Sequence, residues 1–286
     1  MSDLYGFDAF SPREIAERVE NVGVAKAHLP FLPLVMLSLL AGAFIGLGAL
    51  YFTLVTSDAT LGFAASRVLG GVCFSLGLLL VVVAGAELFT GNNLLAMAWA
   101  ERKITTADVL KNWIIVCLAN FIGACGLAAL VFLSGHMGMN GGGVAQQAVK
   151  IAAAKVSMPL MEAFFRGILC NVLVCMAVWM AFAGRSVTDK FIAIVFPISA
   201  FVAAGFEHSI ANMYFIALAL LQQASAPLAL PGAELIDVWH MLRNLAAVIL
   251  GNIVGGSVLV ALVYHVIYHR GRAAAAPAAI EANKHG

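Results

Sequence analysis

The chain has 286 residues, of which 62% are hydrophobic and 11% are charged, and its formal net charge is +1. This composition is far more apolar than a soluble globular domain requires, and the near-neutral charge gives no polybasic surface for nucleic acid. The first thirty residues are polar and lack a short apolar core followed by a cleavage site, so we expect no signal peptide.

The first predicted element is an amphipathic helix near the N-terminus. The stretch Ser11-Pro12-Arg13-Glu14 combines a capping box with a proline in the first helical turn. Ile15, Val19 and Val22 follow at helical spacing. We assign residues 1–29 to this segment and expect it at the cytoplasmic face, either as an interfacial anchor or as a gate.

Six apolar stretches are long enough to cross a bilayer, which takes about 20 residues in a helix. They cover residues 31–54, 68–98, 109–134, 159–183, 191–221 and 242–268. We divide them into a first three-helix repeat over 30–140 and a second over 141–270. The Ala-rich tail, 271–286, is predicted to be disordered and cytoplasmic.

The distribution of Lys and Arg predicts the orientation. With both termini in the cytoplasm, that side carries eleven Lys and Arg residues and the other side carries five. Positive residues are enriched on the cytoplasmic side of membrane proteins. We therefore expect a multi-pass protein of a bacterial inner membrane with both termini inside.

The second and fifth stretches are too long for a straight crossing, and each contains a polar interruption. Gly85–Asn92 and Gly205–Asn212 both read G-x-E-x-x-x-x-N. Placing an ionised side chain at the bilayer centre costs about 3 kcal/mol even on mild scales, so Glu87, Glu207 and His208 must face protein or water. A helix that restarts after such a break exposes backbone amides that favour an anion.

The third and sixth stretches also repeat each other. Lys111-Asn112 is followed by Asn120-x-x-Gly123, and Arg243-Asn244 is followed by Asn252-x-x-Gly255. The two pairs of motifs indicate a duplicated unit of three spans, and because three is odd the halves enter the membrane from opposite sides. Inverted repeats with helices broken at corresponding positions indicate a transport path between the repeats. The predicted fold is therefore an all-α polytopic membrane protein with six transmembrane helices, of which the second and fifth are broken.

Small residues predict where helices approach closely. Gly42-x-x-x-Gly46 and Gly251-x-x-x-Gly255 allow close contact between backbones.

His208 is the histidine that the pattern places deepest. Imidazole titrates near pH 6.5, so this ring can exchange a proton with a passing weak acid. The alternative is a neutral histidine held by a carbonyl or by Asn212. Thr90 and Asn171 offer hydrogen bonds to a substrate or between helices.

Glu87 and Glu207 occupy equivalent positions in the two repeats. They could carry protons, or they could hold their loops by accepting backbone amides or by pairing with Lys155 or Arg166. We favour the structural role. By spacing alone, the aromatic residues Phe74, Phe89 and Phe201 are more typical of packing than of gates.

These segments closely resemble the formate/nitrite transporter family. The resemblance rests on Gly85–Gly91, Gly184-Arg185-Ser186, Gly205–Met213 and Gly251–Gly256, and it extends over residues 10–270. It implies an aquaporin-like fold that assembles as a homopentamer with one pore in each protomer. It also implies transport of small monovalent anions such as formate, nitrite and hydrosulfide.

The resemblance further implies roles for individual residues. His208 matches the family's central histidine, and Thr90 and Asn171 match its substrate-site threonine and asparagine. A periplasmic constriction is implied for Phe74, Leu78 and Phe201, and a cytoplasmic constriction for Leu88, Phe89 and Val174. Lys155 resembles the lysine that attracts anions, in a polar network with Glu207, Asn212, Glu87 and Asn252.

We expect a channel or transporter for formate, with nitrite or hydrosulfide as the alternative substrate. A bare anion would lose its hydration between apolar rings at a large cost, whereas a protonated acid passes more easily. Formic acid has a pKa near 4, as other carboxylic acids do, so acidification favours its uptake with a proton. Whether the protein acts as an anion channel or a proton-coupled carrier stays open.

Functions of other classes fit the sequence less well. A neutral-solute pore of the aquaporin type would carry paired Asn-Pro-Ala motifs, and the chain has no Asn-Pro dipeptide. An enzyme using Ser209 with the adjacent His208 lacks a G-x-S-x-G elbow, and a bis-histidine haem needs a second deep histidine. The five cysteines have no zinc or redox spacing. We expect no enzyme activity, no cofactor and no metal.

Overall fold

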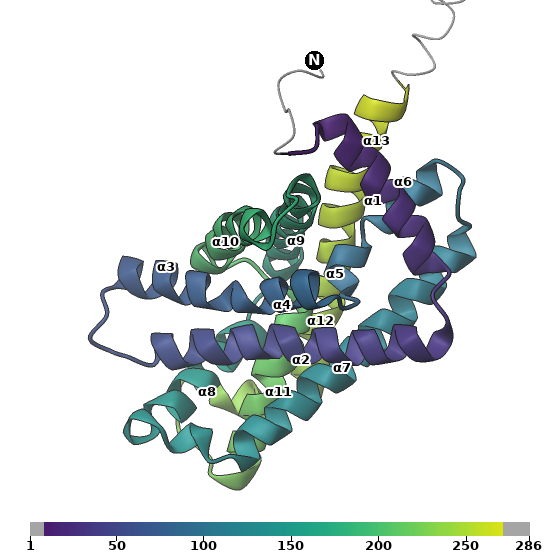
Figure 1. Cartoon of the computed structure of the whole chain (residues 1–286). Helices are drawn as coiled ribbons and strands as arrows, with labels where there is room; N and C mark the ends of the chain where they lie inside the picture. Colours follow the sequence, from purple (N-terminus) through teal and green to yellow (C-terminus); the bar gives the residue numbers. More distant parts are fainter. Residues whose placement is uncertain (1–8, 271–286) are drawn as a thin grey trace, which may run out of the picture.

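The computed structural model describes residues 9–270 and is built of helices (Figure 1). Six helical stretches are long and apolar enough to cross a membrane. They are Phe31–Thr56, Phe63–Ala84, Thr106–Leu133, Leu160–Ala183, Val187–Ala204 and Val238–Tyr268. The number and order of these spans confirm the prediction. The second and fifth end earlier than predicted, because their helices stop at Gly85 and Gly205.

From residue 9 onward, the first half of the chain comprises seven helices. They are α1 (Pro12–Ala27), α2 (Phe31–Thr56), α3 (Phe63–Phe74), α4 (Leu76–Ala84), α5 (Phe89–Asn92), α6 (Leu95–Ala100) and α7 (Thr106–Leu133). The second half contains α8 (Gly143–Val156), α9 (Leu160–Ala183), α10 (Val187–Ala204), α11 (Ser209–Ser225), α12 (Val238–Ile253) and α13 (Val263–His265). Short 3-10 turns (His136–Gly138, Asn140–Gly142 and Ala233–Leu235) and two π-helical segments, η5 (Val254–Leu262) and η6 (Val266–Arg270), complete it.

Both broken spans stop at a glycine with a positive φ angle. Gly85 has φ 80° and Gly205 has φ 74°, which L-residues with a Cβ rarely adopt. Three residues without regular secondary structure follow, the last of them (Leu88 or His208) extended, and the helix restarts as α5 after the first break and as α11 after the second. The breaks therefore fall inside the polar motifs identified in the sequence.

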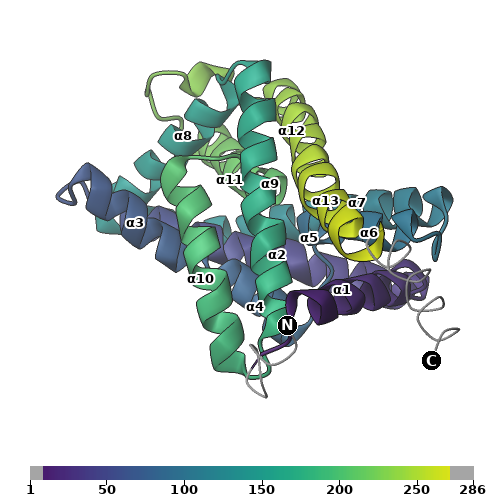
Figure 2. The same ribbon diagram turned by 90° about the horizontal axis from the view of Figure 1, so that it is seen from above.

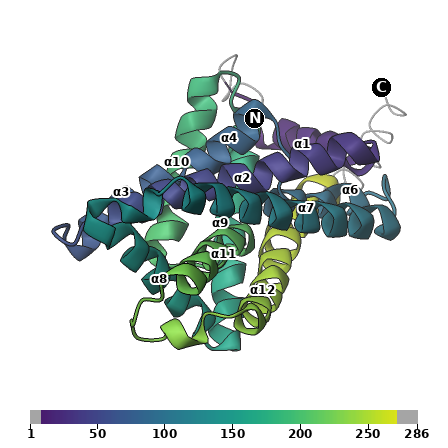
Figure 3. The ribbon, with the colours of Figure 1, turned by 90° about the horizontal axis from the view of Figure 1, so that it is seen from below.

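Glycines bring two pairs of helices into close contact. A Cβ added to Gly42 on α2 would overlap the Asn120 carbonyl on α7, and one on Gly251 of α12 would overlap the Phe164 carbonyl on α9. In each pair, α2 with α7 and α9 with α12, the two helices lie side by side (Figures 2 and 3). The small-residue motifs thus mark the same type of contact once in each half.

The two halves differ at the end of the sixth span. Whereas α7 is a regular α-helix, α12 continues as the π-helical segment η5. The π-helical segment begins at Val254, and a Cβ added to the next residue, Gly255, would overlap the Ile168 carbonyl of α9. The sequence pattern did not predict this change of helix type, which is frequent at functional sites.

The N-terminal helix α1 packs against the bundle. Its start has the predicted capping box, with Ser11 as N-cap and Pro12 as the first helical residue. Ile15 and Val19 are buried in a cluster with residues of α6 and α9. This apolar face therefore contacts protein.

Candidate functional site

Two cavities open at opposite ends of the bundle. One, the α1-side cavity, has a volume of about 440 Å³ and is lined by α1, α4 and the first break. The other, the α8-side cavity, has a volume of about 310 Å³ and is lined by α3, α8, α10 and the second break. Figure 1 shows α1 near the beginning of α2 and α8 near its end, so the cavities enter from the two ends of a membrane span.

His208 lies in the wall of the α8-side cavity and is held at both ring nitrogens. Its Nδ1 accepts a hydrogen bond of 3.2 Å from the Ala211 backbone amide, so the side chain caps α11. Its Nε2 lies 3.1 Å from Thr90 Oγ1. Because a backbone N–H can only donate, Nδ1 carries no proton, and the neutral ring holds its proton on Nε2. The ring therefore donates to Thr90, whose own hydroxyl proton stays available to a further acceptor.

Apolar side chains separate the two cavities. The rings of Phe74 and Phe201 meet edge to face with centroids 5.7 Å apart, and Phe201 stacks on His208 at 5.9 Å. Both phenylalanines line the α8-side cavity, whereas Leu78 and Leu88 line the α1-side cavity. The barrier between the cavities is thus formed by buried apolar groups of α3, α4, α10 and the first break.

Two further residues of the predicted constrictions lie behind this wall. Phe89 and Val174 are buried and line neither cavity. Phe89 packs its ring against Trp113 with centroids 6.4 Å apart. In this conformation both side chains contribute to the core.

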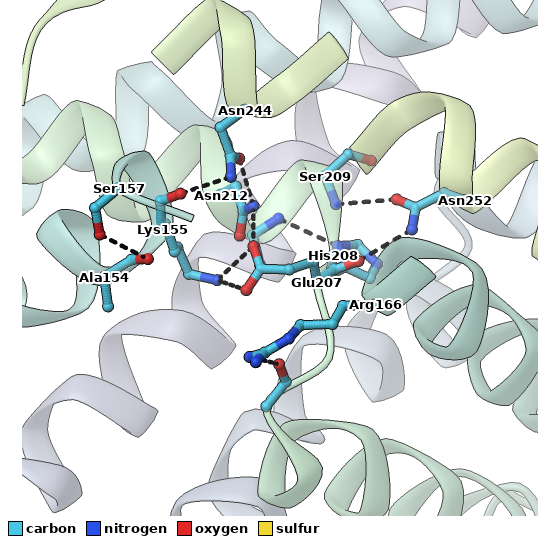
Figure 4. Close-up of polar contacts among 12 residues, drawn as sticks. Ala154, Lys155, Ser157, Arg166, Glu207, His208, Ser209, Asn212, Asn244 and Asn252 are labelled. Atoms are coloured by element: carbon cyan, nitrogen blue, oxygen red, sulfur yellow. Dashed lines mark hydrogen bonds and ion pairs between the residues drawn. The ribbon is translucent and has the colours of Figure 1, made fainter. Parts of the chain in front are cut away.

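Lys155 and Glu207 form an ion pair at the second break. Lys155 Nζ lies 2.9 Å from Glu207 Oε1, and Asn212 donates to Glu207 Oε2 at 2.6 Å (Figure 4). Asn244 accepts from Asn212 at 2.8 Å and donates to the Lys155 carbonyl at 2.9 Å. Of the two partners considered for Glu207, the structure pairs it with Lys155.

The first break carries the same arrangement. Lys26 Nζ lies 2.9 Å from Glu87 Oε1, and Asn92 donates to Glu87 Oε2 at 2.8 Å. Asn112 accepts from Asn92 at 3.0 Å and donates to the Lys26 carbonyl at 3.3 Å. Each break therefore has a Lys, a Glu and two Asn residues joined in the same order.

A buried asparagine fastens each break to its neighbours. Asn252 accepts from the Ser209 amide at 3.0 Å and donates to the carbonyls of Gly167 and Glu207 at 2.8 and 3.0 Å. Asn120 makes the equivalent bonds in the first half. It accepts from the Phe89 amide and donates to the carbonyls of Ser38 and Glu87. The bonds to the amides of Ser209 and Phe89 and to the carbonyls of Glu207 and Glu87 satisfy backbone groups that the breaks leave unpaired.

Asn171 makes hydrogen bonds that have no equivalent in the first half of the chain, from residue 9 onward. Its Nδ2 lies within hydrogen-bond distance of Asn93 Oδ1 at 2.7 Å and of the carbonyls of Asn252 and Thr90 at 2.7 and 3.2 Å. Ser257 on η5 donates to the Asn93 carbonyl at 3.0 Å. Asn171 therefore links the Thr90 loop to the second half of the chain.

Sequence reasoning missed Lys26 and Asn93 as members of these groups. A signal for Lys26 was present, because Lys26-x-x-x-Pro30 and Lys155-x-x-x-Pro159 repeat at a fixed offset. Both prolines cap the helix that follows, α2 in the first half and α9 in the second. No comparable repeat marked Asn93.

The sequence matches that of a known family. The Formate/nitrite transporter family model matches residues 13–266. The chain belongs to this family. It is a multi-pass membrane protein of a family of channels and transporters, and not an enzyme.

Individual relatives and solved structures agree with this assignment. "Formate channel FocA" of Escherichia coli strain K12 is 39% identical over 276 residues, covering 92% of this chain and 96% of that protein. "Formate channel BtFdhC" of Bacillus thuringiensis is 35% identical, covering 91% and 96%. The solved "Pentameric formate channel with formate bound" has a TM-score of 0.76 and 35% identity, covering 83% of this chain and 97% of that one. The "FNT family ion channel" has a TM-score of 0.78 and 30% identity, covering 88% and 97%.

Proposed function

We propose that this chain is a formate channel of a bacterial inner membrane, assembled as a homopentamer with a separate path through each protomer. The relatives named as formate channels and the pentameric neighbour with formate bound support this substrate and this assembly. Nitrite and hydrosulfide are the alternatives, and uptake of each anion in turn separates the three.

The observation that carries the proposal is the position of His208. Its Nε2 and the Thr90 hydroxyl lie together between two cavities, next to the rings of Phe74 and Phe201. An anion that enters from the α8 side meets Lys155 first and the histidine next. The Thr90 hydroxyl, which accepts from His208 Nε2, then donates to the anion and replaces part of the hydration that the anion loses against the apolar rings.

Passage past the rings requires neutralisation of the anion. At rest, His208 has no proton on Nδ1, because the Ala211 amide donates there. A proton that reaches formate therefore comes from the water of the cavity, or through His208 after the bond to Ala211 breaks. In both routes the rate of formate uptake rises as the external pH falls toward the pKa of formic acid, which is about 4.

Replacing His208 tests the proposal. His208→Phe removes the titratable nitrogens and keeps a planar ring, and we expect formate flux to fall at least about tenfold, which corresponds to one lost hydrogen bond to a charged substrate. The measurement is formate and proton flux into proteoliposomes over a series of pH values. His208→Gln keeps an amide donor near the position of Nε2 without titrating, so it separates hydrogen bonding from proton exchange.

His240→Phe is the matched control, because His240 begins α12 and lines neither cavity. We expect it to transport as the wild-type protein does. Unchanged, pH-dependent transport by His208→Phe would contradict the proposed role of the imidazole.

A further inference from the structure

The α8-side cavity is lined by two arginines to which the pathway described so far gives no role. Arg67 on α3 and Arg166 on α9 are both half-buried, and they share the cavity wall with Lys150 and Lys155. The one carboxylate lining this cavity, Glu207, is already bonded to Lys155. The lining therefore has an excess of positive charge.

Backbone carbonyls at the end of α10 hold both guanidinium groups. Arg67 Nε donates to the Ala203 carbonyl at 3.0 Å, and Arg166 Nη1 donates to the Gly205 carbonyl at 3.4 Å. The C-terminal end of a helix carries a partial negative charge, which favours cations there. Within residues 9–270, the structure gives the Nη1 and Nη2 groups of Arg67 no hydrogen-bond acceptor. Arg166 has one carboxylate nearby, on Glu162, at 3.4 Å and at an exposed position.

The two guanidinium groups converge over Gly205. A methyl group added at this glycine would lie 2.7 Å from Arg67 Nη2 and 3.9 Å from Arg166 Nη1. Two cations held so close together repel each other. An anion placed between them removes this repulsion, and the planar arginine fork matches the two oxygens of a carboxylate.

We propose that Arg67 and Arg166 form an outer anion-binding site on the α8 side, selective for a planar, singly charged carboxylate or oxyanion. The anion binds here before it moves to Lys155 and His208, so the proposal rests on the proposed function. The site is one-sided. The α1-side cavity is lined by Lys26, Lys190 and Glu87, and none of its lining residues is an arginine.

The paired variant Arg67→Gln with Arg166→Gln tests the site. We expect the half-saturating formate concentration for entry from the α8 side to rise on the order of tenfold, the effect of one lost charge-assisted contact. The maximal flux and the half-saturating concentration for entry from the α1 side stay unchanged. The measurement is initial formate flux into oriented proteoliposomes at several formate concentrations.

Two controls distinguish specific binding of the anion by the two arginines from attraction by the overall positive charge on the α8 side. Arg243→Gln removes a cation from α12 outside the cavity lining and is expected to leave both half-saturating concentrations unchanged. The pair Arg67→Lys with Arg166→Lys keeps the charge without the fork and is expected to recover only part of the affinity. Full recovery by the lysines, or an equal loss in Arg243→Gln, would overturn the proposal.

Loss of folding is kept apart from loss of binding. Arg67→Gln alone leaves the Arg166 bond to the second break in place, and size-exclusion chromatography reports whether each variant assembles as the wild type does. A wild-type protein that carries no formate would contradict the proposed function together with this site. Wild-type transport with an unchanged half-saturating concentration in the paired variant would overturn the arginine site alone.

Discussion

His208 has a counterpart in the first half of the chain, and the two positions differ in polarity. The offset of 120 residues that relates Glu87 to Glu207 relates Leu88 to His208. A leucine cannot accept a hydrogen bond from a helix amide, and α5 accordingly begins without a side-chain cap. The repeated backbone thus supports a polar group on one side of the barrier and an apolar group on the other.

The asparagines that hold the breaks are expected to be essential for stability. Asn252→Ala removes three hydrogen bonds at a fully buried position and leaves a buried amide and two carbonyls without this partner. An unsatisfied buried polar group costs about 1–3 kcal/mol, so we expect the free energy of unfolding to fall by roughly 3 kcal/mol or more. Thermal unfolding in detergent measures the change.

Asn140→Gly is the control for this prediction, because Asn140 has a φ angle of 55°, which glycine adopts without strain. Asn140 is exposed and donates to the Ser57 carbonyl at 3.1 Å, so water can replace its bond. We expect an effect below about 1 kcal/mol. Equal stability of the two variants would show that the break does not depend on Asn252.

Among the elements, α1 has one end that the sequence predicts and one end whose contact the sequence does not predict. The capping box and the proline fix where the helix begins, because both act within one turn of the chain. Its far end depends on the ion pair of Lys26 with Glu87, which lie 61 positions apart in sequence. A pattern within a few residues cannot predict a contact between positions so far apart in the sequence. The repeated Lys-x-x-x-Pro motif was the one indication that Lys26 takes part in it.

Removal of the Lys26 charge is expected to loosen α1. Lys26→Met leaves the Glu87 carboxylate buried without its lysine partner. Removing one partner of a buried ion pair lowers stability by about 3–5 kcal/mol. We expect a lower free energy of unfolding and faster hydrogen exchange over residues 20–27. The second change Glu87→Gln, added to Lys26→Met, removes the unpaired charge and is expected to restore most of the loss. Full stability of the single variant would contradict an attachment by this pair.

At the scale of the whole molecule, the sequence predicts what depends on composition and on residues close in the chain. The six spans follow from hydropathy, and the breaks follow from Gly85 and Gly205 within polar motifs. The π-helical segment and the convergence of Arg67 with Arg166 depend on how helices pack against each other, which no short motif encodes. The roles of the site residues in transport stay predictions.

The orientation in the membrane is predicted from charge, and the positions of the cations support this prediction. Of the five Lys and Arg residues expected outside, four (Arg67, Lys150, Lys155 and Arg166) line the α8-side cavity. These four cations lie on α3, α8 and α9, so the loops on that side carry almost no positive charge. Loop charge sets topology, and the α1 side is therefore predicted to be cytoplasmic.

Fusions of reporter proteins test this orientation in cells. Alkaline phosphatase joined after Gly286 is expected to be inactive and green fluorescent protein at the same place to fluoresce, because the first needs the periplasm to mature and the second needs the cytoplasm. A phosphatase fused after Leu61, in the loop that follows α2, is the control and is expected to be active. An active phosphatase at the C-terminus would reverse the orientation, and the two arginines would then bind anions that leave the cell.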